Sequence, residues 1–172
     1  MRIISGLFIL LAVIPALGRP IATQMATPQK SAPILVAEGA VDHRLELSAA
    51  DLAGMPRAQA MITDHDGAKK NYDGVPLTEI LQRAGVPLGD KLRGQALTLG
   101  FVVEAADGYK VAFTLSELDS NFGNKTVILA DRVDGAPLTG DEAPLRVIVP
   151  GEKHLACSAR MVKRIVVVRI GG

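Results

Sequence analysis

From residue 34 onward the chain is a series of short apolar segments separated by turn-forming residues, and this pattern limits the folds open to it. Runs of four to nine residues rich in Val, Ile and Leu, bounded by Gly, Pro and Asp, predict strands. The predicted strands are 34–37, 44–47, 58–63, 96–104, 110–113, 126–130, 145–149 and 165–170. Because no regular strand–helix–strand alternation accompanies them, the sequence predicts an α+β fold and not a Rossmann-like one.

Helices are few and short. The segment 77–85 is predicted to be helical because Leu77, Ile80 and Leu81 fall on one face and a glycine ends it. A second helix is predicted after Ser48, which is placed to cap it in a capping box. Residues 116–118 predict a single helical turn. The pentapeptide Asp-Gly-x-Pro-Leu occurs at 73–77 and again at 134–138, and we interpret each copy as a turn that directs a leucine into the core.

The N-terminus has the pattern of a secretory signal peptide. Arg2 is followed by an apolar run over 3–17 without charges, and small residues at positions 16 and 18 suit a signal peptidase. A membrane anchor is the alternative, but it needs about 20 apolar residues and this run is shorter. We therefore expect a signal peptide over 1–18, a flexible linker over 19–33 and one domain over 34–172. Because Arg2 stands alone, the signal is of the Sec type, and a periplasmic or secreted protein is expected.

Charge and cysteine content exclude several classes of function. The formal net charge is +1 and aromatic residues make up 3% of the chain, so neither a basic surface nor stacking platforms for nucleic acid are expected. No membrane span is expected after signal cleavage. Cys157 is the single cysteine, which rules out an internal disulfide and zinc sites built on paired cysteines.

No residue is assigned a catalytic or metal-binding role from its surroundings. The histidines at 43, 65 and 154 lack ligand spacing, although His65 lies between two aspartates. Cys157 is either a small buried apolar residue or a nucleophile activated by neighbouring basic residues. A stronger signal is the basic cluster over 151–170, which is consistent with an anion site or with an edge strand protected by charge. This cluster consists of Lys153, Arg160, Lys163, Arg164 and Arg169.

The order of several motifs resembles the molybdopterin-binding domain of sulfite-oxidase-type oxidoreductases. The segment 73–86 is similar to that family's GVPL helix, Asp107-Gly108-Tyr109 to its DGY strand, and 143–150 (APLRVIVP) to its GPLRLVVP strand. The closing segment 160–165 (RMVKRI) is similar to its R-x-V-K-x-I motif. The resemblance spans roughly residues 34–170 and implies a mixed β-sheet with few short helices.

In that family the domain binds the pyranopterin of the molybdenum cofactor, and basic residues hold its phosphate. Carried over by position, the resemblance implies that Arg160 is the phosphate contact and Lys163 its neighbour, while Lys153 and His154 match more loosely. It also implies a pocket between residues 60–67, 105–110 and 151–163.

One departure from the family bears on function. Catalytic members bind molybdenum through a cysteine on the strand before the GVPL segment, and residues 60–67 (AMITDHDG) contain none. The chain resembles the short, exported, stand-alone members that lack this ligand. A Sec signal also implies export of an unfolded chain, whereas the cofactor is inserted in the cytoplasm.

Three hypotheses follow for the function. The first is a non-catalytic module without cofactor, which binds a small anionic ligand or a periplasmic partner protein. The second is a molybdopterin-dependent oxidoreductase, or a subunit of one, that retains the cofactor through basic phosphate contacts. The third is a thiol-dependent enzyme using Cys157.

Overall fold

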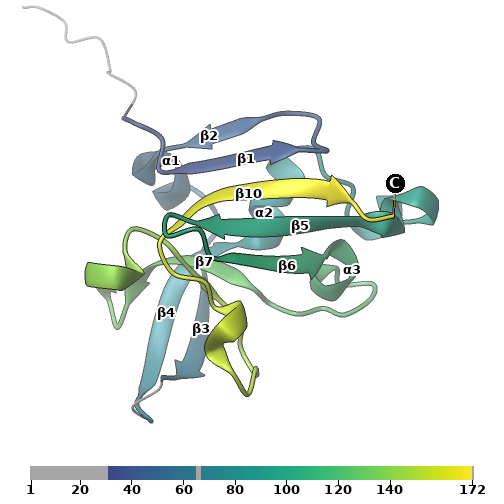
Figure 1. The fold of residues 1–172 in the computed structure, drawn as a ribbon. Coiled ribbons are helices and arrows are strands. Elements are labelled where there is room, and N and C mark those ends of the chain that lie inside the picture. Colours follow the sequence, from purple (N-terminus) through teal and green to yellow (C-terminus); the bar gives the residue numbers. More distant parts are fainter. Residues whose placement is uncertain (1–30, 65–66, 172) are drawn as a thin grey trace, which may run out of the picture.

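The computed structural model describes residues 31–64 and 67–171 and builds them into two β-sheets (Figure 1). The predicted signal peptide and most of the predicted linker lie outside the described residues, as does His65. The α+β class and the mixed sheet with few short helices, both predicted from sequence, are confirmed.

Sheet A contains both parallel and antiparallel pairs. Its order is β2-β1-β10-β5-β6, in which β1 runs parallel to β10 and the other pairs are antiparallel. The strands are β1 (Leu35–Gly39), β2 (Leu45–Leu47), β5 (Leu99–Ala105), β6 (Lys110–Thr114) and β10 (Val162–Arg169). Since β10 lies between β1 and β5, the interpretation of its charges as protection of an edge strand is wrong.

Sheet B is antiparallel and carries the hairpin that projects downward in Figure 1. Its order is β3-β4-β7-β8, and β9 pairs with the first part of β7. The strands are β3 (Ala58–Thr63), β4 (Lys69–Pro76), β7 (Ile128–Val133), β8 (Ala136–Pro137) and β9 (Arg146–Ile148).

The helical elements are short and join the strands. The α-helices are α1 (Ala49–Ala53), α2 (Leu77–Arg83) and α3 (Leu115–Leu118), and the 3-10 helices are η1 (Gly89–Lys91), η2 (Gly94–Thr98), η3 (Gly140–Glu142) and η4 (Leu155–Cys157). The predicted capping box of α1 is present, since the Ser48 side chain accepts from the Asp51 N–H and the Asp51 carboxylate accepts from the Ser48 N–H. The predicted apolar face of α2 is fully buried in the larger of two apolar clusters.

The two copies of the repeated pentapeptide have different structures. Residues 73–76 end strand β4, so the prediction of a turn there is wrong. Gly74 is needed because a Cβ at this position would lie 2.2 Å from the Leu129 carbonyl oxygen of β7. In the second copy, Asp134 and Gly135 both have positive φ and form the tight turn between β7 and β8. Both following leucines, Leu77 and Leu138, are buried as predicted.

Among the described residues, no helix is both long and apolar enough to span a lipid bilayer.

Candidate functional site

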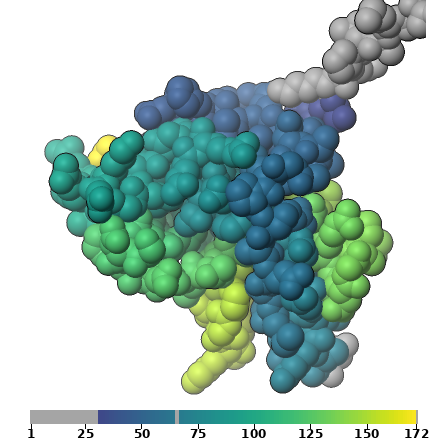
Figure 2. All heavy atoms as spheres, turned by 180° about the vertical axis from the view of Figure 1, so that it is seen from behind, coloured from purple at the N-terminus to yellow at the C-terminus, as the bar shows by residue number. Residues whose placement is uncertain are grey.

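A cleft of about 950 Å³ opens between sheet B and the segment that leads into β10. Figure 2 shows it from behind as the hollow between two projections, one formed by the β3–β4 hairpin and the other by residues 150–160. Its lining comes from residues 61–64, from the β5–β6 turn and from residues 151–160. These are the three segments between which the resemblance implies a pocket.

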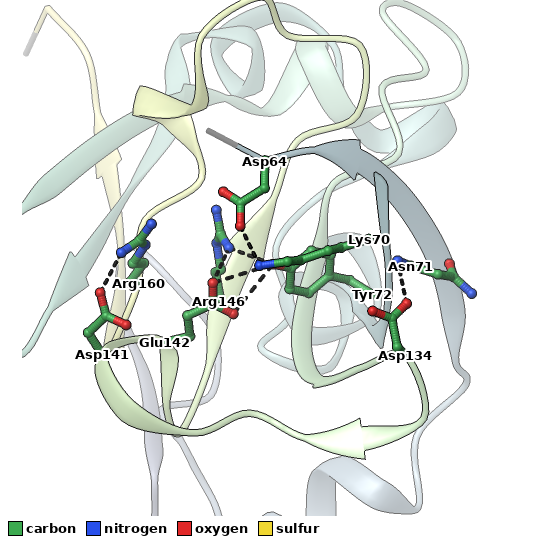
Figure 3. A network of polar contacts seen from close by, with 9 residues as sticks. All are labelled: Asp64, Lys70, Asn71, Tyr72, Asp134, Asp141, Glu142, Arg146 and Arg160. Carbon is green, nitrogen blue, oxygen red and sulfur yellow. Dashed lines mark hydrogen bonds and ion pairs between the residues drawn. The ribbon is translucent and has the colours of Figure 1, made fainter. Parts of the chain in front are cut away.

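Three of the four predicted phosphate contacts line this cleft: Lys153, His154 and Arg160. Arg160 forms an ion pair with Asp141, whose side chain is 71% exposed (Figure 3). Because an exposed pair contributes about 1 kcal/mol or less, a bound anion could take the place of Asp141 at small cost. No ion pair joins Lys153 or His154 to another described residue.

The fourth predicted contact, Lys163, does not line the cleft. It is exposed on β10, close enough to Glu104 of β5 to help lower the pKa of that carboxyl, although the hydrogen bond from Lys110 is the largest cause. Its neighbour Arg164 lies 3.4 Å from Glu38 and 3.9 Å from Glu104. The basic cluster of the sequence is therefore divided: Lys153 and Arg160 line the cleft, Lys163 and Arg164 lie near Glu104 on sheet A, and Arg169 donates to the Gln95 carbonyl oxygen.

A buried arginine, Arg146 of β9, also lines the cleft (Figure 3). Its side chain is 1% exposed, and Nη1 donates to the Tyr72 hydroxyl and to Glu142, both at 2.6 Å. The guanidinium carbon lies 5.1 Å from the centre of the Tyr72 ring. Burial is the main cause that raises the pKa of Tyr72, while the nearby Arg146 charge acts to lower it. The Nε of Arg146 is buried without a hydrogen-bond partner, which is rare for such a group and is explained if a bound molecule accepts from the guanidinium.

Two exposed apolar side chains form part of the cleft wall. Met61 of β3 is 58% exposed and Tyr109, between β5 and β6, is 47% exposed. The Tyr109 hydroxyl donates to the Ala156 carbonyl oxygen at 2.8 Å and so connects the β5–β6 turn to the 151–160 segment. The cleft thus combines apolar wall surface with charged side chains of both signs, a composition typical of sites for small organic ligands.

The described residues contain no group of three or more His, Cys, Asp or Glu side chains that could hold a metal ion. Cys157 lies at the end of η4, is partly buried and packs against the larger apolar cluster. Its neighbours Ala156 and Ser158 line the cleft, and Cys157 does not.

A comparison with protein-family models decides the family. Residues 24–170 match the model described as the oxidoreductase molybdopterin binding domain. The chain belongs to this family. The resemblance seen in the sequence motifs is thereby confirmed, and the match covers nearly the whole described domain.

Among solved structures, the domain is similar to the sulfane dehydrogenase SoxCD from Paracoccus pantotrophus. The TM-score is 0.58 and the sequence identity 22%, over 77% of this chain and 37% of the SoxCD chain. At this identity the likeness supports a shared molybdopterin-binding fold, and the chain spans little more than a third of the SoxCD chain. No curated protein sequence matches the chain.

The residues of the cleft fit one part of the family's cofactor and not the other. Lys153, Arg160 and the guanidinium of Arg146 suit the phosphate and the polar edge of a pterin. The cleft, however, offers no thiolate to the metal. Strand β3, which lines it, contains no cysteine, and Cys157 packs against the larger apolar cluster. The cleft therefore has cationic side chains suited to a phosphate and offers no thiolate to molybdenum.

Sequence reasoning missed Arg146 as a cleft residue, whereas Met61 and Tyr109 lie in two of the segments that were expected to border the pocket. Arg146 had a detectable signal, because a lone arginine inside the apolar run 145–149 must be paired if it is buried.

Proposed function

We propose that this member of the molybdopterin-binding domain family is a non-catalytic, exported module that binds an anionic ligand in the cleft. The observation that carries the proposal is a cleft with Lys153, His154 and Arg160 on one wall and no cysteine on β3. The ligand is a small anionic molecule or an acidic part of a partner protein. The sequence pattern at residues 1–18 supports a periplasmic or secreted location.

The second candidate function is a molybdopterin-dependent oxidoreductase, or a subunit of one. Membership of the family favours it, and so does the fit of the basic residues to a phosphate. It requires that the phosphate and pterin contacts alone retain the cofactor, because the cleft offers no thiolate to the metal. The thiol-enzyme hypothesis has less support, since Cys157 is partly buried against the core.

Binding of pyrophosphate, measured by isothermal titration calorimetry, tests the proposal. Charge-assisted hydrogen bonds contribute about 1.5–3 kcal/mol each, so Arg160→Ala is expected to weaken binding by about tenfold or more. Arg83→Ala removes an equal charge from the exposed end of α2 and serves as the matched control, with affinity changed less than about twofold. Lys163→Ala is expected to behave like the control, because Lys163 lies outside the cleft.

Absence of pyrophosphate binding to the unmodified protein would refute an anion-binding cleft. Equal losses from Arg160→Ala and Arg83→Ala would place binding outside the cleft and would refute the assignment of the site.

A further inference from the structure

Among the described residues, strand β3 forms one free edge of sheet B, and its unpaired backbone groups can be assigned. The Asp64 N–H donates to the Ala68 carbonyl oxygen at 2.8 Å, so these two residues form a hydrogen-bonded pair. In an antiparallel ladder such pairs alternate with non-bonded ones. Met61 and Thr63, opposite Asn71 and Lys69, therefore direct N–H and C=O away from β4. Strand β4 shows the same alternation, because the Asn71 carbonyl oxygen accepts a hydrogen bond from the Asp134 N–H on the side of β4 away from β3.

The cleft runs along this free edge. Its lining includes Met61, Ile62, Thr63 and Asp64, four consecutive residues. Side chains of successive strand residues point to opposite faces of a sheet. A cavity that touches all four must therefore follow the edge of the strand, where the free N–H and C=O groups of Met61 and Thr63 lie.

The β3 edge lacks the features that usually protect an edge strand. It is six residues long and has no proline, no lysine and no bulge in its pairing with β4. The other free edges have such features. Strand β2 is only three residues long, and β8 has two residues and includes Pro137. Strand β6 begins at Lys110, and at its other end the Thr114 N–H already donates to the Glu117 carboxylate. The outer side of β9 is covered, since Val147 N–H donates to the Ala159 carbonyl oxygen.

The charges that face this edge select the partner. Two of the three carboxylates lining the cleft are already held by cations, Asp64 by Lys70 and Glu152 by Lys125. The third, Asp107, accepts from the backbone N–H of Tyr109. Lys153 has no ion pair with a described residue, and the partner of Arg160 is an exposed carboxylate. The opposite wall of the cleft therefore favours negative charge.

From the edge and the charges together, we infer that the cleft binds an extended, acidic peptide segment of a partner protein, which adds a strand to β3. The inference rests on the proposed function, because the carboxylates of the segment would use the same basic wall. An extended backbone is the chemistry that matches the edge: it repeats a donor and an acceptor every two residues, roughly 7 Å, as Met61 and Thr63 do. Side chains that alternate along such a segment would reach Met61 and Tyr109 on the wall.

The test uses the full-length protein purified from its own host. Twelve-residue peptides that bind this protein are selected from a random display library and then synthesised. Affinities are measured by fluorescence polarisation. Selected peptides are expected to be acidic and rich in β-branched residues. Met61→Pro is expected to weaken their binding at least tenfold. Proline at 61 removes an N–H that points away from β4, so it costs no ladder hydrogen bond within sheet B. Met61→Val keeps this N–H and changes only the side chain, so it is expected to weaken binding much less than Met61→Pro does.

A second arm acts on the peptide instead of the protein. N-methylation at alternate peptide residues removes the donors on one edge, and one of the two methylation registers is expected to abolish binding. This arm keeps the inference falsifiable if Met61→Pro fails to fold, as judged by circular dichroism.

Selection of no peptides would overturn the inference. So would affinities that change neither with Met61→Pro nor with N-methylation of the peptide. Formation of a dimer that Met61→Pro abolishes would overturn it in favour of a second copy of the chain. Pyrophosphate titration distinguishes the two proposals: if pyrophosphate binds and peptides do not, the proposed function stands alone.

Discussion

At the scale of single residues, the floor of the cleft depends on one buried ion pair. Arg146 is 1% exposed and its charge is balanced by Glu142, which it reaches through Nη1. Tyr72 lies beside both groups and is fully buried. This arrangement holds the guanidinium rigidly against the cleft, and its energy depends on both partners being present.

Glu142→Gln is expected to lower the free energy of unfolding by about 3 kcal/mol, because it leaves the buried guanidinium without a counter-charge. Asp141→Asn is the matched control at the adjacent position, where an exposed ion pair with Arg160 contributes at most ~1 kcal/mol. Urea denaturation measures both. A loss no larger for Glu142→Gln than for Asp141→Asn would contradict the account of this ion pair.

The ionisation of Tyr72 provides a pH test. The chain has two tyrosines, so in a Tyr109→Phe variant the ultraviolet titration reports Tyr72 alone. Burial raises its pKa, so the midpoint is expected above the ordinary value of about 10. The folded state then retains the phenolic proton longer than the unfolded state does. This contribution to stability is present below the ordinary pKa and is lost as the pH rises through the folded pKa. A midpoint at or below the ordinary value would contradict the burial of this hydroxyl.

At the scale of elements, the edge-to-edge fit of β4 and β7 positions β3 and hence one wall of the cleft. The two strands approach so closely at Gly74 that the Leu129 carbonyl oxygen occupies the space of a Cβ. A register shift in the pairing occurs at the same place, between Asp73 and Gly74. Arg57 connects the strands further by ion pairs to Asp73 and Asp131.

Gly74→Ala is expected to destabilise the protein by at least ~2 kcal/mol, since the new methyl group would clash with backbone atoms that cannot move separately from β7. Gly135→Asn is the matched control in the second pentapeptide. A Cβ there meets open space, and asparagine accepts the positive φ of the turn, so a change below ~1 kcal/mol is expected. Thermal unfolding followed by circular dichroism would measure both, and equal losses would be inconsistent with a close approach at Gly74.

The sequence predicted those elements whose signal is local. The capping box at Ser48, the apolar face of α2 and the strand 58–63 are all confirmed. Strand β4 was missed because its residues, KKNYDGVP, are mostly poor strand formers, and pairing on both sides by β3 and β7 overrides this preference.

The cleft was predicted in part. Arg160, Lys153 and His154 are brought together there, but Lys163 is not, because β10 places it on one face of sheet A. Strand β9, within the predicted strand 145–149, is buried throughout. Strand β10 is also a central strand, but it exposes Lys163, Arg164 and Arg169.

At the scale of the whole molecule, the fold of a cofactor-binding family surrounds a cleft that has cationic side chains on one wall and no cysteine on β3. Residues 24–170 match the family model, so nearly all of the described domain belongs to the matched segment. The basic wall is formed by residues 151–160, opposite β3, and the cysteine-free edge of β3 faces it across the cleft. The central claim is that this combination binds an anion without molybdenum.

Molybdenum content is the most direct test of that claim. The protein is purified from its own host without chelators, and molybdenum is measured by inductively coupled plasma mass spectrometry, with the fluorescence of oxidised pterin measured on the same sample. The account predicts molybdenum far below one atom per chain. Stoichiometric molybdenum with stoichiometric pterin would contradict it and would establish the oxidoreductase alternative in its place.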